Sequence, residues 1–356
     1  RSIALSYPLA GNSSNLALTL KANSGPIDVQ ALGATDTLLG HISLQGTAIY
    51  LKGNVFSMRS LETNGDITVS SNLTLSGDLG ITLNNNLIAS TDSFDVILQS
   101  SKGSIQVQNL GSDTLNLGSI LISNYGNIDS GNLLSKKDIT LSGTSITLGS
   151  KFAASGNVQI TNTGDVTIPS GNLNLSGSFM QTGSGSVYFG GTIITQGSIA
   201  FGGALMITSV TTLQGTNGIS ITGSIAPESG NPGLTLDAKS NSLAATFKTS
   251  AENSFGAIAI KASDFNLKGD LYSNTSIYIE PPMTISANTV VSSLGGYGGI
   301  AFAKSVLATQ GNLSLEVDSA QGTVDVENLG SKDLPLGKIF LSGTAITLRG
   351  SSYSTD

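Results

Sequence analysis

Residues 25–57 read GPIDVQALGATDTLLGHISLQGTAIYLKGNVFS, and this stretch decides the fold because its pattern recurs along the chain. It returns at residues 322–354 as GTVDVENLGSKDLPLGKIFLSGTAITLRGSSYS. Two further copies begin at Gly103 and Asn241, of which the last is the faintest. Repeats of this kind are typical of solenoid proteins, in which each coil packs only on its neighbours.

The second copy gives an estimate of coil length. We assign it to GSIQVQNLGSDTLNLG at residues 103–118 and DITLSGTSITLGSKFA at residues 138–153, which leaves 19 extra residues between Gly118 and Gly143 relative to the other copies. A slip of one residue turns every side chain of a strand to the opposite face. An insertion is harmless if it equals one whole coil, so we predict coils of about 19–20 residues.

Short apolar-polar-apolar runs fill the chain, for example Ile42–Leu44, Ile67–Val69 and Leu173–Leu175, and Gly, Asn or Ser flanks them. Such alternation between turn-forming residues predicts half-buried strands. No amphipathic helix is expected, and the one weak candidate, residues 241–252, aligns with a strand of another copy. The predicted fold is all-β, a single-stranded parallel β-helix (β-solenoid).

The copies also pair off at a longer distance. Gly25 and Asn241 are 216 residues apart, and Gly103 and Gly322 are 219 apart. We interpret this as a tandem duplication with two repeats, a complete one at residues 1–216 and an incomplete one at residues 217–356 that continues the first. The ends show no cap, so we expect an excerpt of a longer array that stacks end to end or frays.

Comparing copies separates inward from outward positions. Ile27 and Val29 become Val324 and Val326, and remain apolar in the other copies, so we place them in the core. Asp28 lies between them and becomes Gln, Asp or Ala, so we place it in solvent. Glycines of the pattern are expected at turns with positive φ. Repeated aromatic residues are expected in the core or in stacks: Phe56, Phe152, Tyr272 and Tyr353.

Composition excludes several function classes. Only 11% of the residues are charged and the net charge is −7, with no basic cluster, which argues against nucleic-acid binding. No cysteine is present, which excludes disulfides and thiolate metal sites. No apolar run is long enough for a transmembrane helix, so none is expected.

No catalytic, cofactor-binding or metal site is predicted. His41 is the only histidine, and its counterparts are Lys338 and Ala257, which indicates a variable outward position. Five carboxylates lie at different places in the repeat, and we interpret them as solvated: Asp28, Asp66, Asp78, Asp129 and Asp138. Asparagines are expected to form ladders along the coils.

The strings GDITVSSNLTLSG (65–77), NVQITNTGDVTI (157–168), GNLNLSG (171–177) and GNLSLEV (311–317) resemble the repeats of filamentous-haemagglutinin-type bacterial exoproteins. The resemblance covers most of the chain, although the NPNGI secretion motif of that family is absent. It implies a right-handed β-helix, extracellular display and a shaft role.

The expected function is therefore a structural shaft segment of a large secreted or cell-surface bacterial adhesin or filament, without catalysis or cofactors. Its expected partners are neighbouring coils or units of the same protein, with end-to-end self-association as one possibility, and a host-cell, bacterial-cell or glycan receptor. Two alternatives stay open: a glycan-binding β-helix module and a polysaccharide lyase or hydrolase. A flat face of outward Thr, Asn or aromatic residues favours binding, and a groove with three carboxylates, or with carboxylates and Arg, favours the enzyme.

Overall fold

A computed structural model describes residues 1–11, 16–91, 93–295 and 298–355. The described residues form strands and turns and include no α-helix, so none of them belongs to a helix that could cross a membrane. The chain divides into two compact units, unit 1 (Arg1–Ser176) and unit 2 (Gly177–Asp356). Residue 216, where sequence comparison places the repeat boundary, falls inside unit 2.

The strands of unit 1 are β1 (Ile3–Leu5), β2 (Leu18–Lys21), β3 (Ile27–Val29), β4 (Ile42–Leu51), β5 (Val55–Ser57), β6 (Ser60–Val69), β7 (Leu73–Gly77), β8 (Gly80–Ala89), β9 (Val96–Ser100), β10 (Ile105–Leu110), β11 (Ile120–Asn124), β12 (Ile128–Ser135), β13 (Ile139–Gly143), β14 (Ile146–Thr147), β15 (Phe152–Ala154), β16 (Val158–Asn162) and β17 (Val166–Leu175).

The strands of unit 2 are β18 (Phe179–Gly183), β19 (Val187–Thr195), β20 (Ile199–Phe201), β21 (Leu205–Gly215), β22 (Ile219–Ile221), β23 (Ser224–Pro227), β24 (Leu234–Asp237), β25 (Leu243–Phe247), β26 (Ile258–Lys261), β27 (Phe265–Lys268), β28 (Leu271–Ser273), β29 (Ile277–Ile279), β30 (Met283–Ile285), β31 (Thr289–Ser293), β32 (Ile300–Phe302), β33 (Val306–Ala308), β34 (Leu315–Ser319), β35 (Thr323–Val326), β36 (Ile339–Ser342) and β37 (Ala345–Leu348).

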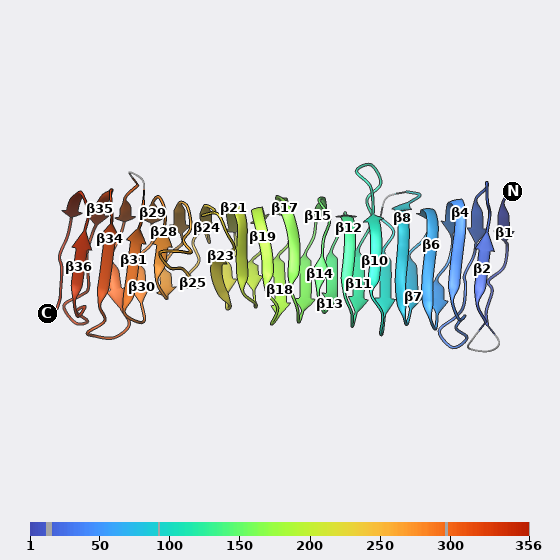
Figure 1. The fold of residues 1–356 in the computed structure, drawn as a ribbon, viewed down its shortest axis with the longest axis horizontal. Coiled ribbons are helices and arrows are strands. Elements are labelled where there is room, and N and C mark those ends of the chain that lie inside the picture. The colour runs from blue at the N-terminus through green and yellow to red at the C-terminus, as the bar shows by residue number, and fades with distance from the viewer. Residues whose placement is uncertain (12–15, 92, 296–297, 356) are drawn as a thin grey trace. The chain divides into compact units, whose positions relative to one another are not determined.

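Both units are parallel β-solenoids, with about 16 turns in all, as the alternation predicts (Figure 1). Strands inside a stack pair in parallel with the strand one coil before and the strand one coil after, as β11 does with β9 and β13, and β34 with β31 and β36. In unit 1 one such stack runs β5-β7-β9-β11-β13-β16. In unit 2 a corresponding stack runs β28-β31-β34-β36. Residues 241–252, the weak helix candidate, contain β25 and are a strand as predicted.

Apolar ladders form the core of each unit. In unit 1, Ile27 pairs with Ile49, Ile49 with Ile67, and Ile67 with Leu87, and all four are fully buried. Burial of one such side chain stabilises the fold by about 1.5–3 kcal/mol. The predicted inward positions are confirmed, because Ile27, Val29 and their counterparts are buried: Ile105, Val107, Leu243, Ala245, Val324 and Val326.

The outward position between them carries a repeated ion pair. The Asp28 carboxylate lies 2.7 Å from the Lys52 ammonium, and Asp325 lies 2.8 Å from Arg349 at the same place in the later copy. These side chains are between 39% and 47% exposed, which confirms that the position faces solvent.

Coil length is less uniform than the sequence suggests. Ile120 pairs with Ile139, 19 residues later, as the predicted coil requires. Other coils are shorter or longer: Ile128 pairs with Ile146 after 18 residues, whereas Thr289 pairs with Leu315 after 26. Part of the variation lies within strands, where the register of β4 on β6 shifts between Gln45 and Ala48.

Four serines show how the copies of the pattern fold. Each Oγ donates a hydrogen bond to the carbonyl oxygen of a glycine 17 residues earlier: Ser57 to Gly40, Ser135 to Gly118, Ser273 to Gly256, and Ser354 to Gly337. The first three serines are also buried, and each accepts a hydrogen bond from the backbone N–H two residues later. These bonds tie adjacent turns of the solenoid together.

This geometry corrects our assignment of the second copy. Gly118 and Ser135 have the same separation as Gly40 and Ser57, so the copy is an unbroken stretch, residues 103–135, without an insertion. The stretch DITLSGTSITL belongs to the next coil, whose β13 stacks on β11. Neighbouring coils resemble one another because they fill the same core, and that resemblance displaced the alignment by one coil.

The glycines of the pattern are expected at positive-φ turns, and its repeated aromatic residues in the core or in stacks. One glycine of the pattern has a left-handed backbone in three copies, with φ of 71° at Gly33, 84° at Gly111 and 72° at Gly330; in the fourth copy Gly269, at a different glycine position, has φ of 82°. At the first three, an added Cβ would lie within 2.6 Å of a carbonyl oxygen of the following coil. The repeated aromatics are not in the core. Phe56, Phe152 and Tyr272 are half-buried and Tyr353 is exposed, because they occupy outward positions.

Candidate functional site

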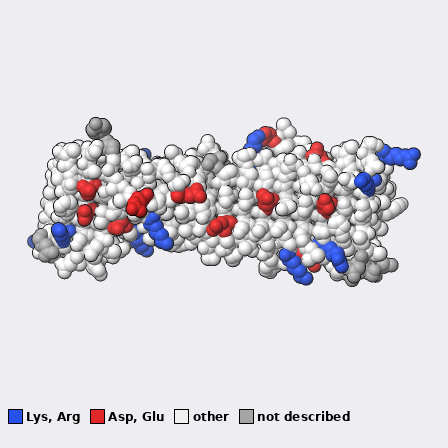
Figure 2. Space-filling view, viewed as in Figure 1, with Lys and Arg blue, Asp and Glu red and all other residues white. Residues whose placement is uncertain are grey.

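His41 and the carboxylates considered from the sequence do not come together in one site. His41 Nδ1 lies 2.8 Å from the Ser60 hydroxyl, at a half-buried position. Among the described residues, no three His, Cys, Asp or Glu side chains gather closely enough to hold a metal ion. Figure 2 shows the charged side chains of one face as separate spots on a largely uncharged surface.

An asparagine ladder crosses unit 1, as predicted. Asn109 Nδ2 donates to Asn86 Oδ1 at 2.6 Å, and the Asn132 backbone N–H donates to Asn109 Oδ1 at 2.9 Å. Asp66 Oδ1 accepts from the Asn86 side chain at one end. The backbone N–H of Lys151 donates to Asn132 Oδ1 at the other end. The ladder therefore satisfies its own polar groups across successive coils.

A hollow lies beside this ladder and has a volume of about 280 Å³; we call it the unit 1 hollow. Its lining residues are Asp66, Asn86, Ile88, Asn109, Gly111, Ser112, Asp113, Asn132, Leu134 and Lys151. Lys151 and Asp113 form an ion pair within it. Its lining holds two carboxylates and no Arg. It therefore lacks the combination of carboxylates that favours a polysaccharide-cleaving enzyme.

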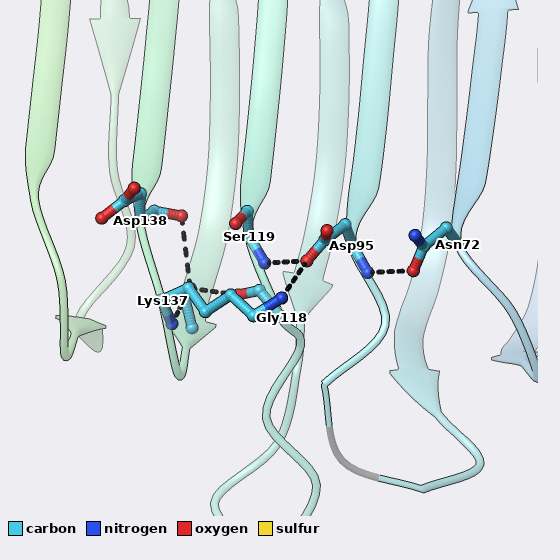
Figure 3. A network of polar contacts seen from close by, with 7 residues as sticks. Asn72, Asp95, Gly118, Ser119, Lys137 and Asp138 are labelled. Carbon is cyan, nitrogen blue, oxygen red and sulfur yellow. Dashed lines mark hydrogen bonds and ion pairs between the residues drawn. The ribbon is translucent and has the colours of Figure 1, made fainter.

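A second polar network marks where strands begin in unit 1. Asn72, Asp95 and Ser119 directly precede β7, β9 and β11 (Figure 3). Asn72 Oδ1 accepts from the Asp95 backbone N–H at 3.0 Å, and Asp95 Oδ1 accepts from the Ser119 N–H at 2.7 Å. The Lys137 ammonium lies 3.2 Å from the same Asp95 oxygen.

These contacts set the charge state of Asp95. The hydrogen bond from the Ser119 backbone lowers the pKa of this carboxyl below its usual value of 3.8, burial opposes the shift, and Lys137 lowers the pKa further. Both contacts are made by Oδ1, which ties this carboxylate to the next coil and to Lys137. Asp95 is therefore part of the scaffold of unit 1.

Unit 2 repeats this scaffold. We call the outward side of β5, β7, β9 and β11 the unit 1 face, and the outward side of β28, β31, β34 and β36 the unit 2 face. In unit 1, Asn54 Oδ1 accepts from the Thr74 N–H at 2.9 Å. In unit 2, Asp270 Oδ1 accepts from the Val290 N–H at 2.8 Å, 216 residues later.

A second hydrogen bond repeats in the same way. Asn288 Oδ1 accepts from the Ser314 N–H at 2.9 Å, which corresponds to the bond from Asp95 to Asn72. The core registers also match, since Leu73 pairs with Val96 in unit 1 and Thr289 pairs with Leu315 in unit 2. The two faces are thus built on equivalent backbone geometry.

The outward side chains of the two faces differ. Ile97 and Leu121, on β9 and β11, are half-buried apolar residues. At the equivalent positions, 219 residues later, unit 2 carries Glu316 on β34 and Phe340 on β36, both exposed. Ser119 is replaced by Lys338. The unit 2 face therefore combines an aromatic ring with charges of both signs.

A hollow opens on the unit 2 face. This unit 2 hollow has a volume of about 330 Å³ and is lined by Asp270, Asn288, Thr289, Val290, Ser314, Leu315, Glu316, Lys338 and Phe340. Neither the Glu316 carboxylate nor the Lys338 ammonium has a hydrogen bond or ion pair with another described residue. Its two carboxylates come without Arg, so it also lacks the pattern expected of the enzyme alternative.

Tyr272, on β28, is close enough to Asp270 and Glu316 of this hollow to be affected by their charges. Burial raises the pKa of its phenol above the usual value of 10.0, and the negative charges of Asp270 and Glu316 add to the shift. The phenol therefore stays protonated at neutral pH and can donate a hydrogen bond.

Comparison with known proteins adds no relative: no family model, curated protein or solved structure matches this chain. Sequence reasoning missed the unit 2 hollow because it concentrated on the residues that the copies share. The offset of 219 could have revealed it, since Ile97 and Leu121 become Glu316 and Phe340 at outward positions where the surrounding pattern is retained.

Proposed function

We propose that this chain is a shaft segment of a large secreted or cell-surface bacterial adhesin or filament, without a catalytic role. The observation that carries the proposal is the parallel solenoid of about 16 turns with apolar ladders throughout both units. Such a fold adds length by adding coils, without needing a new core. The resemblance to filamentous-haemagglutinin-type repeats points to the same role.

The surface is consistent with extracellular display. Charged residues are 11% of the chain, and the polar surface consists mainly of Ser, Thr, Asn and Gly. A polar surface of low charge attracts few nonspecific partners, whereas clusters of one sign would bind nucleic acids or lipid headgroups. We propose neighbouring coils or units of the same protein and a cell-surface receptor as the partners of the shaft.

Antibody labelling tests this proposal. Antibodies raised against residues 1–356 should label intact cells of the source organism, and external protease should remove the signal. An antibody against a cytosolic protein serves as the control for cell integrity. Labelling that appears only after the cells are lysed would contradict the proposal.

A glycan-binding module is the second candidate function. The unit 2 hollow favours it, because an exposed aromatic ring stands there beside a carboxylate, an ammonium and an amide. Convergent polar groups next to an apolar surface are typical of small-ligand sites. Binding and shaft functions can coexist, since the hollow occupies only one face of a few coils.

A further inference from the structure

We propose that the unit 2 hollow binds a neutral, hydroxyl-rich sugar chain, with the Phe340 ring as its platform and Glu316 and Lys338 as its hydrogen-bonding partners. This inference deepens the second candidate function, the glycan-binding module, and stands apart from the shaft proposal.

Phe340 has the geometry of a platform. Its neighbours Ile339 and Leu341 pair with the buried residues Leu315 and Val317, so strand alternation directs the ring outward. The side chain is 46% exposed on β36, the last strand of its stack in this chain. An exposed aromatic ring loses little conformational entropy on binding and offers an apolar face to the C–H groups of a sugar ring.

The polar groups beside the ring suit hydroxyl ligands. Glu316 is the direct register neighbour of Phe340, and its carboxylate can only accept hydrogen bonds. The Lys338 ammonium and the Asn288 side-chain NH₂ can only donate. A hydroxyl both donates and accepts, so sugar hydroxyls can satisfy both kinds of group at once.

The charges of the hollow favour a neutral ligand. Asp270 and Glu316 are negative and Lys338 is positive, and the chain as a whole carries a net charge of −7. A sulfated or carboxylated sugar chain would meet this negative field and bind more weakly. A peptide cannot extend the sheet at β34, because β31 and β36 already occupy both of its edges.

Unit 1 provides a matched internal control. Its face has the same backbone hydrogen bonds but carries Ile97, Leu121 and Ser119 in place of the three recognition residues. Oδ1 of Asp95, a carboxylate of that face, already accepts hydrogen bonds from the Ser119 N–H and the Lys137 ammonium. The unit 1 face should therefore not bind the ligand of the unit 2 face.

Calorimetric titration of the 356-residue chain tests the site. The neutral probes are cellohexaose, chitohexaose and maltohexaose, and the anionic probe is a heparin-derived hexasaccharide. We expect at least one neutral probe to bind and heparin to bind more weakly. Phe340→Ala and Glu316→Gln should each weaken that binding by about tenfold, as expected for a lost apolar platform or a lost charged hydrogen bond. The matched variant Leu121→Ala should leave it unchanged.

Each other outcome overturns the site. Absence of binding by all neutral probes refutes the ligand class, and preferential heparin binding refutes the charge argument. Equal weakening by Phe340→Ala and Leu121→Ala, in variants whose melting temperatures match the parent chain, would place the ligand elsewhere. Surface labelling of intact cells is independent of all these results, so failure here and failure of the shaft proposal are distinguishable.

Discussion

The unit 1 face and the unit 2 face share their strand registers and two backbone hydrogen bonds, yet present different chemistry to solvent. Ile97 and Leu121 cover the first with apolar atoms, whereas Glu316 and Phe340 give the second a carboxylate and an exposed ring. The difference shows that the solenoid constrains inward side chains and turn contacts and leaves outward positions free. Function can then change on one coil without any change in the fold.

The largest expected effect comes from charging the shared core. Leu98 and Val317 are equivalent inward residues, and both are fully buried. Leu98→Asp and Val317→Asp should each lower the free energy of unfolding by several kcal/mol, because a buried carboxylate has no partner there. Urea denaturation measures this loss.

The adjacent outward positions serve as controls. Glu316→Ser should stay within about 0.5 kcal/mol of the parent, as is usual for surface substitutions, and Ile97→Ser, at a half-buried position, should cost much less than Leu98→Asp. Similar losses for inward and outward variants in either unit would contradict the assignment of the two faces.

The serine contacts give the next largest effect. Ser57→Ala and Ser273→Ala each remove a buried hydroxyl that donates to a glycine carbonyl of the preceding turn. Leaving buried polar groups unpaired should cost about 1–3 kcal/mol in each unit. The losses are measured as shifts of the urea midpoint. Ser43→Ala, at an outward position of β4, is the control and should leave the midpoint unchanged. A loss in only one unit would show that the two contacts are not equivalent.

A small and pH-dependent difference should separate the units. The folded-state pKa of Asp95 is lowered, so its stabilising contribution is present above the unfolded value of 3.8 and is lost as pH falls through the folded pKa. Asp95→Asn should therefore lower the urea midpoint at about pH 6 but have little effect at about pH 2.5. The equivalent residue Ser314 does not titrate, so Ser314→Asn should show no such pH dependence. A constant effect of Asp95→Asn at both pH values would contradict this account.

Sequence patterns predicted the fold and distinguished inward from outward side chains. They could do so because period-2 alternation and the repeated copies depend directly on burial. They misplaced the second half of the second copy, since adjacent coils fill the same core and therefore look alike. Phe56 and Tyr272, which the repeats predict in the core or in stacks, are not in the core and lie at half-buried outward positions. The unit 2 hollow depends on side chains from four successive coils, and contacts of that kind become visible only when the register is known.

The most direct test of the central claim, that two equivalent backbone scaffolds differ in ligand binding because of their outward side chains, is to transplant one face onto the other. The triple substitution Ile97→Glu, Ser119→Lys and Leu121→Phe places the recognition residues of unit 2 on unit 1. Calorimetric titration with the neutral probe that binds the parent chain then gives the number of sites. We predict an unchanged fold and a rise from one site to two. A variant that fails to fold, or that folds and still binds at one site, would contradict the claim.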